Sequence, residues 1–545
     1  MFTAMLSKSW WPDRIRAIAP SHITSSHRSD FGSQKGLASL RWRRFIDPSH
    51  SYTSMRTLSH FIIAVLITCS VANVRAQANE TETPTKPNVL FIFLDDFGWR
   101  DAGFMGSDFY QTPNLDALAA KGMVFNNAYA GAANCAPSRA CLLSGQYSPR
   151  HEIYNVGTTR RGKKQHGKLM HVPGTDTLRK DIKTWAHCVH EAGYRTGTIG
   201  KWHLSNDPLP YGFDFNFAGT HSGSPPRGYY PPHGNIAELK DAPKDEYLTN
   251  RLTDEAIGFI ERNQQQPWFL YLTHFAVHTP IQGEPELVRK YQNLPPGKLH
   301  QHPVMAAMIE SMDRGVGKIT AALDRLDLAD NTIIVFTSDN GGYGPATSMA
   351  PLKGYKGTYY EGGIREPMFV VWPGVTKPGT TCDWPVINVD LLPTFCSMTG
   401  AQLPNQAIDG VSLTPLLTGQ ASSDMQDRSI YWHFPAYLQS YARTDQQRDP
   451  LFRSRPCTVM RSGKWKLHEY FEDGDLELYD LEADAGEQNN LVSTQPDVAK
   501  RLHDEMQAWR RATNAPVPST PNPNYDANSE AAAINKLGRN KTSKK

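Results

Sequence analysis

The sequence has little of what marks several common classes of protein. Seven cysteines in 545 residues are too few for a disulfide scaffold, and neither an HExxH motif nor paired CxxC motifs occur, which argues against a zinc site. No apolar run is as long as a membrane-spanning helix, and no internal repeat stands out. These absences leave an ordinary globular protein without a transmembrane helix, and its length favours two domains.

Net charge excludes a further class of partner. The formal charge of +3 comes from the first 76 residues, which hold ten Lys and Arg but only three Asp and Glu. The rest of the chain carries 47 basic and 51 acidic residues, a net charge of −4. Bulk electrostatics therefore give no reason to expect nucleic-acid binding.

Met55 begins a segment that is typical of a secretory signal peptide. A basic residue precedes the apolar run 61–68, and small residues before and at Ala76 suit cleavage there. We therefore expect export, to the periplasm or the exterior. Lipid attachment at Cys69 is a weaker alternative, because Thr68 is a poor residue to precede the cysteine of a lipobox.

Four apolar runs are each followed at once by polar residues. Runs of this length fit strands buried on both faces, as in a mainly parallel sheet covered by helices. Ligands bind such sheets beyond the carboxyl ends of the strands, where these polar residues would lie. The predicted strands are 88–94, 195–200, 268–273 and 332–337, and the predicted helices between them are 114–121, 178–192, 248–263 and 304–326.

A polar stretch, 421–427, suggests a boundary after the large domain. Beyond it come strand-like pieces at 429–433, 457–461, 465–470 and 477–481, then a helix at 497–512. The predicted organisation is 1–54, not folded or not translated; 55–76, signal peptide; 77–86, linker; 87–420, catalytic domain; 428–514, small C-terminal domain; and 515–545, a disordered tail rich in Pro, Asn and Ser.

Two strand ends carry oxygen donors that suit a metal ion. Asp95 and Asp96 follow one strand, and Asp339 and Asn340 follow another. Three carboxylates held close together call for a compensating cation, and a set of hard oxygen donors favours calcium first and magnesium second. Taken singly, each pair could instead be a helix cap or a polar turn.

A candidate nucleophile is Cys135, at the start of the stretch that ends with Gly145. Pro137 suits the first turn of a helix, so Cys135 would lie at a helix N-terminus, where backbone N–H groups favour anions. An unmodified thiolate could act there as a nucleophile, and a disulfide or a buried free thiol are the structural alternatives.

Several blocks of the sequence together resemble type I sulfatases, members of the alkaline phosphatase superfamily. The resemblance spans about 88–420 and implies an alkaline phosphatase-like α/β fold, with a large, mainly parallel mixed sheet between helices and a smaller C-terminal α+β domain that carries an antiparallel sheet. The matching blocks are Asp95-Asp96-Phe97-Gly98-Trp99, Thr112-Pro113-Asn114-Leu115-Asp116, Cys135-Ala136-Pro137-Ser138-Arg139, Gly200-Lys201-Trp202-His203-Leu204, His278-Thr279-Pro280, Ser338-Asp339-Asn340-Gly341-Gly342 and Lys356-Gly357-Thr358.

The resemblance also implies a reaction. Cys135 would be oxidised to formylglycine by a maturation enzyme, and the hydrated aldehyde would attack sulfur, with a covalent sulfo-enzyme intermediate. The implied catalytic residues are Cys135, Arg139, Lys201, His203, His278 and Lys356, and the implied calcium ligands are Asp95, Asp96, Cys135, Asp339 and Asn340.

The expected substrate is a sulfate ester on a small molecule or glycan, because the family includes arylsulfatase-like and carbohydrate-specific enzymes. The groups that recognise the alcohol part of the ester would lie in the loops 220–235 and 443–457. Three alternatives stay open at this point: phosphate or phosphonate ester hydrolysis on the same scaffold, a non-catalytic binder of sulfated glycans, and a hydrolase that uses unmodified Cys135.

Overall fold

The computed structural model describes residues 86–545 apart from 235, 422–424, 442–445 and 543–545. Residues from Thr83 to Lys545 form one unit of the chain. The predicted signal peptide at 55–76 and the possible lipid site, Cys69, lie outside the described residues. So does nearly all of the predicted linker.

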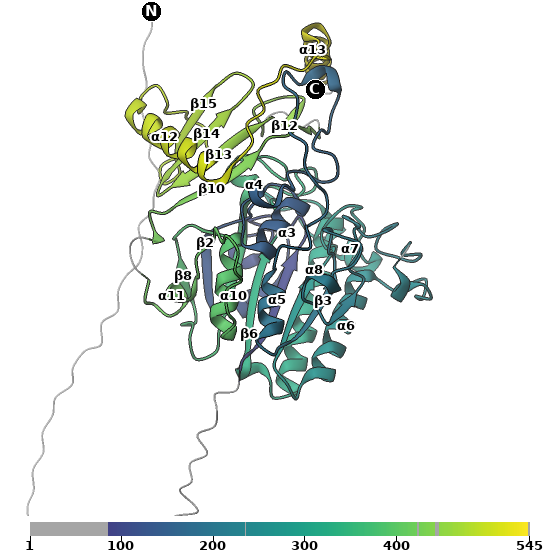
Figure 1. Cartoon of the computed structure of the whole chain (residues 1–545). Coiled ribbons are helices and arrows are strands. Elements are labelled where there is room, and N and C mark those ends of the chain that lie inside the picture. The colour runs from purple at the N-terminus through teal and green to yellow at the C-terminus, as the bar shows by residue number, and fades with distance from the viewer. Residues whose placement is uncertain (1–85, 235, 422–424, 442–445, 543–545) are drawn as a thin grey trace, which may run out of the picture. The chain divides into compact units, whose positions relative to one another are not determined.

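A mixed, mostly parallel sheet lies at the centre of the described structure (Figure 1). Its strand order is β4-β3-β5-β1-β6-β7-β2-β8, with β9 pairing β2, and only β7 runs antiparallel to its neighbours. The sheet confirms the predicted α/β fold class. Its strands are β1 (Asn88–Leu94), β2 (Met123–Tyr129), β3 (Arg195–Gly200), β4 (Phe215–Phe217), β5 (Trp268–Thr273), β6 (Thr332–Ser338), β7 (Arg365–Val371), β8 (Thr380–Cys382) and β9 (Val386–Ile387).

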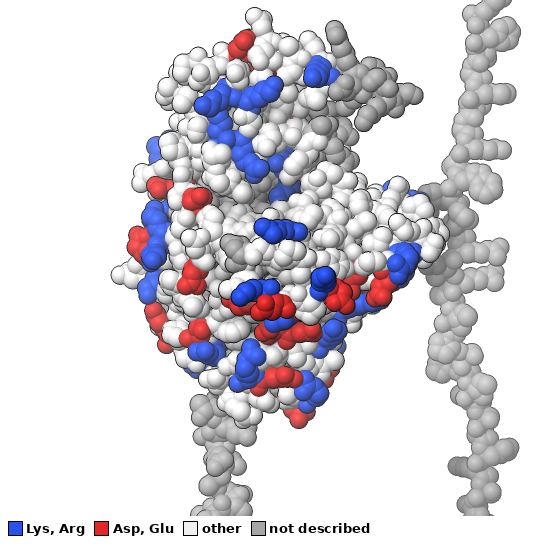
Figure 2. All heavy atoms as spheres, turned by 90° about the vertical axis from the view of Figure 1, so that its right-hand side faces the viewer, with Lys and Arg blue, Asp and Glu red and all other residues white. Residues whose placement is uncertain are grey.

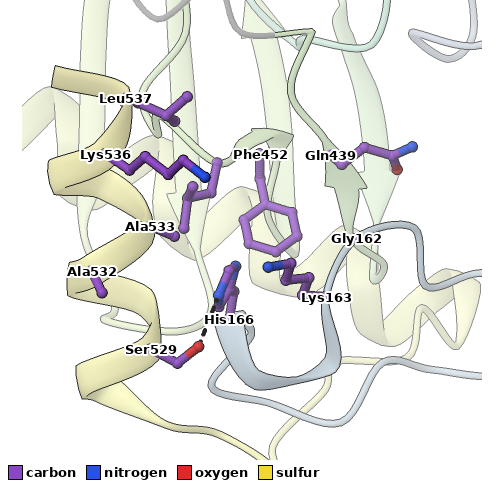
Figure 3. A pocket seen from close by; sticks show the side chains of 11 residues that line it. Gly162, Lys163, His166, Gln439, Phe452, Ser529, Ala532, Ala533, Lys536 and Leu537 are labelled. Carbon is purple, nitrogen blue, oxygen red and sulfur yellow. Dashed lines mark hydrogen bonds between the residues drawn. The ribbon is translucent and has the colours of Figure 1, made fainter. Parts of the chain in front are cut away.

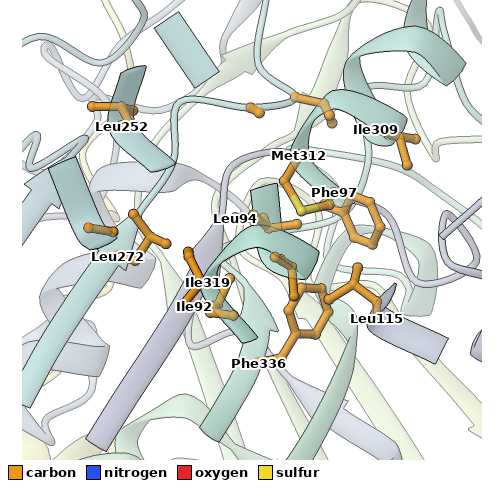
Figure 4. Close-up of a cluster of buried hydrophobic side chains, with 14 of the residues drawn as sticks. Ile92, Leu94, Phe97, Leu115, Leu252, Leu272, Ile309, Met312, Ile319 and Phe336 are labelled. Atoms are coloured by element: carbon orange, nitrogen blue, oxygen red, sulfur yellow. The ribbon is translucent and has the colours of Figure 1, made fainter. Parts of the chain in front are cut away.

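Helices cover both faces of this sheet because its strands are apolar on both sides. Along β1, Ile92 and Leu94 belong to a core with α2, α6 and α8 (Figure 4), whereas Phe91 and Phe93 belong to a second core with α3, α5 and α10. The helices are α2 (Pro113–Ala119), α3 (Cys135–Ser144), α4 (Ser148–His151), α5 (Trp185–Glu191), α6 (Leu248–Asn263), α7 (Pro285–Gln292), α8 (Pro303–Arg325), α9 (Glu361–Ile364), α10 (Leu391–Thr399) and α11 (Thr414–Leu417).

Three of the four predicted helices are confirmed as α2, α6 and α8, and the fourth is wrong in its first half. The helix predicted at 178–192 begins only at Trp185. Thr184 ends the extended segment before it, since its side chain accepts a hydrogen bond from the His187 N–H and the His187 side chain bonds back to the Thr184 N–H. This capping box starts the helix seven residues later than predicted.

The strand register brings four strand ends to one edge. Leu94 of β1 pairs with Ser338 of β6, Phe93 pairs with Thr273 of β5, and Thr273 also pairs with Gly200 of β3. Residues that follow these four strands in the sequence are therefore neighbours in space. This is the edge where ligands bind in parallel sheets.

A second, antiparallel sheet has the order β10-β13-β14-β15, and α12 packs on it through Leu502 and Met506. All four strand-like pieces and the helix predicted beyond 427 are confirmed. The elements are β10 (Ser429–Phe434), β13 (Cys457–Ser462), β14 (Trp465–Tyr470), β15 (Leu476–Asp480) and α12 (Pro496–Thr513), with a separate hairpin of β11 (Leu438–Gln439) and β12 (Phe452–Ser454). The domain boundary at 421–427 falls partly outside the described residues and stays a prediction.

The tail predicted to be disordered is instead partly helical. It contains α13 (Ala527–Thr542), which lies beside the loop around η2 (Lys164–His166). Asn522 donates to the carbonyls of Lys164 and Gly167, and Glu530 forms an ion pair with Arg455. Composition alone suggested disorder, because the partners that order this polar tail lie 75 to 358 residues away in the sequence.

The described cysteines after Ala76 are all free thiols, so the structure contains no disulfide among them. Within the same described range, every helix is too short or too polar to cross a bilayer.

A buried ion network joins the two sheets. Lys466 of β14 donates to Glu361 of α9 at 2.9 Å and lies 2.9 Å from Glu487, and all three side chains are fully buried. Glu487 also accepts from the Glu361 N–H. Burial raises the pKa of Glu487 to about 7, although Lys466 opposes this shift.

We predict that Lys466→Met lowers the thermal midpoint by several degrees at pH 8. Removing one partner of a buried pair leaves an uncompensated charge, which costs about 3–5 kcal/mol. The loss should be smaller at pH 5. The pKa of Glu487 is raised in the folded state, so its carboxyl binds a proton more tightly in the folded protein than in the unfolded chain. At pH 5 the carboxyl is therefore neutral, and it needs the charge of Lys466 less.

Calorimetry at both pH values checks this prediction. Lys464→Met is the matched control, since it removes a half-exposed ammonium, which pairs with Asp480, from the turn just before β14 and should change the midpoint little. An equal fall of the thermal midpoint in the two variants would contradict the proposal that the buried network stabilises the fold.

Candidate active site

The predicted catalytic and metal-binding residues converge at the carboxyl edge of the large sheet. All are buried except His278, which is partly exposed. They are Asp95 and Asp96 after β1, Cys135 and Arg139 in α3, Lys201 and His203 after β3, His278 after β5, Asp339 and Asn340 after β6, and Lys356 before α9.

The backbone at two of these positions is left-handed. Asp96 has a φ of 59° and His203 a φ of 68°, values that cost energy for residues other than glycine and that cluster at functional sites. Gly200, just before Lys201, has a φ of 105°, and a Cβ there would lie 2.1 Å from the Thr273 carbonyl oxygen. Only glycine fits this turn, which aims Lys201 and His203 into the site.

Each of the three carboxylates already has a cationic side chain beside it. Lys201 Nζ lies 2.6 Å from Asp95, Lys356 Nζ lies 2.5 Å from Asp96, and Arg139 Nη2 lies 2.9 Å from Asp339. The expectation that these carboxylates need a metal for charge balance is therefore wrong. The chain supplies three positive charges for three negative ones, so a metal must be argued from the arrangement of donors.

Cys135 occupies the centre of this cluster. Its thiol donates to Asp95 Oδ1 at 3.4 Å and to Asp96 Oδ1 at 3.9 Å, and Lys356 Nζ donates to its sulfur at 3.2 Å. Cys135 is the first residue of α3, so the helix N-terminus faces the same space. A nucleophile and an anion would both be stabilised here.

Four of the donor side chains lie close enough together that they could hold a metal ion. Asp95, Asp96, Cys135 and His278 each offer one ligand atom, and these atoms lie within 4.8 Å of one another. Asn340 Nδ2 donates to Asp96 Oδ1 at 2.8 Å, whereas its Oδ1, though buried, has no hydrogen-bond partner among the described residues. An unpaired buried oxygen beside clustered carboxylates fits a hard cation.

The pKa values of the two adjacent carboxyls, Asp95 and Asp96, are shifted in opposite directions. Burial raises the pKa of Asp95 well above its usual range, despite the nearby Lys201. Burial also acts on Asp96, but there Lys356 and His278 prevail and hold its pKa below the usual range. Lys356 in turn has a raised pKa, because the charge of Asp96 outweighs burial, and it stays protonated.

His278 presents an unprotonated nitrogen to Asp96. Its Nδ1 lies 2.8 Å from the Thr279 carbonyl oxygen, which can only accept, so Nδ1 carries the proton. Burial and then Lys356 lower the pKa of His278, which is therefore neutral near pH 7. Its Nε2 lone pair faces Asp96 Oδ2 across 3.7 Å, which is too long for a hydrogen bond.

His203 lies near the cationic side chains of Lys201, Arg139 and Lys356. Burial and then Lys201 lower its pKa well below the usual range, and its Nδ1 has no hydrogen-bond partner among the described residues. A neutral imidazole with a free nitrogen is able to accept a proton.

The sequence analysis missed residues that hold the site together. Thr273 accepts from Arg139 at 2.5 Å and donates to the Lys201 carbonyl at 3.0 Å, which links three segments. Its position at the end of a predicted strand was the only available signal. Arg453 donates to the Lys356 carbonyl at 3.0 Å, and no pattern in the sequence indicated that contact.

Comparison with family models and curated proteins identifies the sulfatase family. The family model described as "Sulfatase" matches residues 87–401, and the model described as "N-sulphoglucosamine sulphohydrolase, C-terminal" matches residues 355–512. A sulfatase of Formosa agariphila is 30% identical over 514 residues, which cover 79% of this chain and 90% of that protein. Arylsulfatase A of Bos taurus is 30% identical over 469 residues, which cover 76% of this chain and 85% of that protein.

A solved structure agrees with these matches. The crystal structure of Ps i-CgsB superimposes with a TM-score of 0.65 at 29% identity, covering 83% of this chain and 98% of that one. The same protein in complex with k-i-k-neocarrahexaose gives a TM-score of 0.64 at 29% identity, with the same coverage.

We predict that Arg139→Ala destabilises the protein by about 3–5 kcal/mol, because it leaves Asp339 buried without its cation and removes the bond to Thr273. Thermal unfolding followed by circular dichroism checks the loss. Arg325→Ala, which removes an exposed pair with Glu261, is the control and should cost at most about 1 kcal/mol. An unchanged midpoint in Arg139→Ala would show that the pair does not hold this edge together.

Proposed function

The chain belongs to the sulfatase family of the alkaline phosphatase superfamily and is a sulfuric ester hydrolase, and from that premise we propose that formylglycine made from Cys135 and one calcium ion form its catalytic centre. The net reaction consumes water and a sulfate ester and releases an alcohol and sulfate. Two alternatives of the sequence analysis, a non-catalytic binder of sulfated glycans and a phosphate or phosphonate ester hydrolase, have no support from the family matches.

The observation that carries this proposal is the position of Cys135. Its sulfur lies at a helix N-terminus, 3.2 Å from the Lys356 ammonium and 3.4 Å from Asp95. A group at this position touches both the cationic and the anionic parts of the cluster. We therefore assign the nucleophile to position 135.

Modification explains why an oxygen nucleophile would replace the thiol. The hydrate of a formylglycine aldehyde supplies one hydroxyl for attack at sulfur and a second hydroxyl, which serine lacks, for release of sulfate. Cys135 is only 1% exposed in the folded chain. A formylglycine-generating maturation enzyme would therefore act before the chain folds.

Calcium fits the donor set of this site. Asp95, Asp96, Asp339 and Asn340, with the oxygen at position 135, would hold it, and magnesium is the second choice. When bound, a divalent cation lowers the pKa of an oxygen ligand and attracts the sulfate group. The three ion pairs leave the cluster without a net charge. The two positive charges of a calcium ion would then balance the single negative charges of a sulfate ester and of an ionised nucleophile.

The other side chains have roles that follow from their charge. Lys356 stays protonated, so it would bind sulfate oxygens and keep the ester beside position 135. His278 is neutral in the free site, and a bound sulfate would raise its pKa so that it could protonate the leaving oxygen. Lys201 would hold the nucleophile and His203 would accept its proton, while Arg139 orients Asp339.

The substrate class is a sulfate ester of an aryl compound or, as we favour, of a carbohydrate. Ps i-CgsB, which shares 29% identity with this chain, was crystallised with k-i-k-neocarrahexaose. An exported enzyme, as the segment 55–76 predicts, would meet such polysaccharides outside the cell. From the loops 220–235 and 443–457, Thr220 accepts from the His203 N–H and Arg453 donates to the Lys356 carbonyl, so the described parts of these loops would contact the alcohol.

We predict that the peptide containing Cys135 carries an aldehyde or its hydrate in active, exported protein, as mass spectrometry would detect. Cys135→Ala should lower kcat for 4-nitrophenyl sulfate by at least about a thousandfold, since it removes the nucleophile.

Cys141→Ala is the matched control, because Cys141 lies in the same helix, is equally buried and has a thiol pKa that burial raises above its usual range. This variant should keep most of the activity. Active protein that contains only the thiol at position 135 would overturn the formylglycine proposal.

A second prediction concerns calcium. Extensive dialysis against EDTA should abolish hydrolysis of 4-nitrophenyl sulfate, and added calcium should restore it. Asp339→Asn should weaken calcium binding, measured by isothermal titration calorimetry, by at least about tenfold, because it removes one ligand charge.

Asp330→Asn, at an exposed position before β6, is the control and should bind calcium as the unchanged protein does. Full activity without bound metal, established by elemental analysis, would contradict the calcium assignment.

A further inference from the structure

His300 is a buried histidine that lies outside the catalytic cluster. It belongs to the loop 293–302 between α7 and α8 and to none of the sequence blocks that resemble sulfatases. At the surface, charged side chains of both signs mix, as in the lower part of the face shown in Figure 2, and solvent weakens each pair. The pair of His300 and Asp101 is different, because both side chains are fully buried.

The contacts of His300 fix the position of one of its protons. Its Nε2 lies 3.1 Å from the Ser348 carbonyl oxygen, which can only accept a hydrogen bond, so Nε2 carries a proton. The same nitrogen lies 3.5 Å from Asp101 Oδ1. On the other edge of the ring, Nδ1 lies 3.4 Å from both Asp108 Oδ1 and Ser107 Oγ. The imidazole therefore joins its own loop to the segments that follow β1 and β6.

The imidazole is held in one orientation by its surroundings. The Tyr110 ring packs on it, with ring centroids 4.6 Å apart, and the Tyr110 hydroxyl donates to the Ala346 carbonyl at 2.8 Å. Asp108 accepts from the backbone N–H of His300 at 3.1 Å and from the N–H groups of the two residues before it. The ring and the backbone of its loop are thus both fixed against the segment that follows β1.

Asp101 connects His300 to the turn that follows β1. Its Oδ2 accepts from the Gly98 N–H at 2.8 Å, and its own N–H donates to the Gly98 carbonyl at 3.0 Å. Its Oδ1 accepts from the hydroxyl of Thr347, the neighbour of Ser348. Burial raises the pKa of Asp101, and His300 opposes that rise. His300 therefore favours the ionised form of this carboxyl, which is the form that accepts from both partners.

The turn that carries Asp96 depends on side-chain acceptors. Its backbone is left-handed at Asp96, a conformation that costs energy for a residue other than glycine. The Asp96 N–H donates to Asp339 Oδ1 at 3.2 Å, and the N–H of the next residue donates to Ser338 Oγ at 3.1 Å. Gly98 completes the series with its bond to Asp101. Loss of one of these three acceptors would let the turn relax and move the Asp96 carboxylate.

The turn that follows β6 is supported at the same point. A Cβ on Gly342 would lie 2.5 Å from Thr347 Cγ2 and 3.1 Å from Gly98 Cα, so the two turns are in close contact. The Gly342 carbonyl also accepts from the Lys356 N–H at 3.1 Å. A shift of the segment 346–348, which His300 and Asp101 hold, would therefore reach the residues around Asn340 and Lys356.

We propose that His300 is a positioning residue for the catalytic centre, which holds the turns of the calcium ligands Asp96 and Asn340 through Asp101 and Ser348. It acts through these residues and not on the reacting atoms. The inference rests on the proposed function, because it concerns the geometry of the proposed calcium site. It gives a role in activity to a loop that no motif of the sequence indicated.

Two amide variants separate the two edges of the imidazole. The amide nitrogen of glutamine reaches about as far as Nε2 of histidine, whereas that of asparagine reaches only about as far as Nδ1. His300→Gln can therefore still donate to the Ser348 carbonyl and to Asp101, and His300→Asn loses both contacts. If the contacts of Nε2 position the turns, His300→Gln should behave like the unchanged protein and His300→Asn should not.

Two buried histidines elsewhere in the fold provide matched controls. His433 of β10 also has its Nε2 against a backbone carbonyl, that of Pro516, at 2.9 Å. His166 lines the cavity between α13 and the loop around η2, where its Nε2 lies 3.3 Å from Ser529 Oγ (Figure 3). His433→Asn and His166→Asn therefore measure what the loss of a buried imidazole costs away from the catalytic centre.

The first measurement is hydrogen–deuterium exchange followed by mass spectrometry, well below the thermal midpoint of each variant. In His300→Asn, the peptides that contain Gly98 and Ser348 should exchange at least about fivefold faster than in the unchanged protein, because their hydrogen bonds open more often. In His300→Gln and in both controls, these peptides should exchange at nearly the unchanged rate.

The second measurement is calcium binding by isothermal titration calorimetry. His300→Asn should bind calcium about tenfold more weakly than the controls, because a residue behind the ligands no longer orients them. Its turnover of 4-nitrophenyl sulfate should fall at limiting calcium and largely recover in excess calcium. A purely structural role would lower the thermal midpoint without changing the calcium affinity of the folded protein.

Unchanged exchange of both peptides in His300→Asn would overturn the proposal, whatever its thermal midpoint. Equal acceleration in His300→Gln, or in His433→Asn, would overturn it as well. Should His300→Asn fail to fold, His300→Gln decides the question, since faster exchange at Gly98 and Ser348 in that variant would show that Nε2 does not position them. If the unchanged protein binds no calcium, the calcium part of the proposed function fails, and the exchange measurement still decides the role of His300.

Discussion

Three buried ion pairs at one sheet edge are the constraint on which the rest of this structure depends. Asp95, Asp96 and Asp339 would each be costly to bury alone, and Lys201, Lys356 and Arg139 reach them from separate segments. Because the partners come from different strands and loops, every segment must be correctly placed for any pair to form. The cost of these buried charges is offset elsewhere, by the apolar cores on both faces of the sheet.

The second sheet completes this edge. Arg453 of β12 holds the Lys356 carbonyl, and the Lys466 network ties β14 to α9, which follows Lys356 closely in the chain. The loop that carries Lys356 is therefore held from two sides by residues more than ninety positions away. The same part of the chain also holds α13, because Arg455, two residues after Arg453, pairs with Glu530.

Much of the fold and of the cluster could be predicted because the signals are local. Runs such as 88–94 and 332–337 are apolar throughout, and a parallel register then places Asp95 and Asp339 at the same edge. Other features could not be predicted in this way. The start of α5 depends on the cap at Thr184, the order of the tail depends on Arg455, and the bond from Thr273 to Arg139 depends on the register of β5.

By itself, the sequence determined four strands of the large sheet, the four strands of the small sheet, several helices and the residues to which we assign the chemistry, because periodicity, strand ends and motif spacing are properties of short segments. Only the tertiary structure decided how charge is balanced in the cluster, which tautomer His278 adopts, and that the tail folds back to form a cavity. These depend on distances between side chains far apart in the chain, and electrostatic and hydrogen-bond energies change steeply over a few ångströms. Such distances are set by the packing of whole elements, which no short segment records.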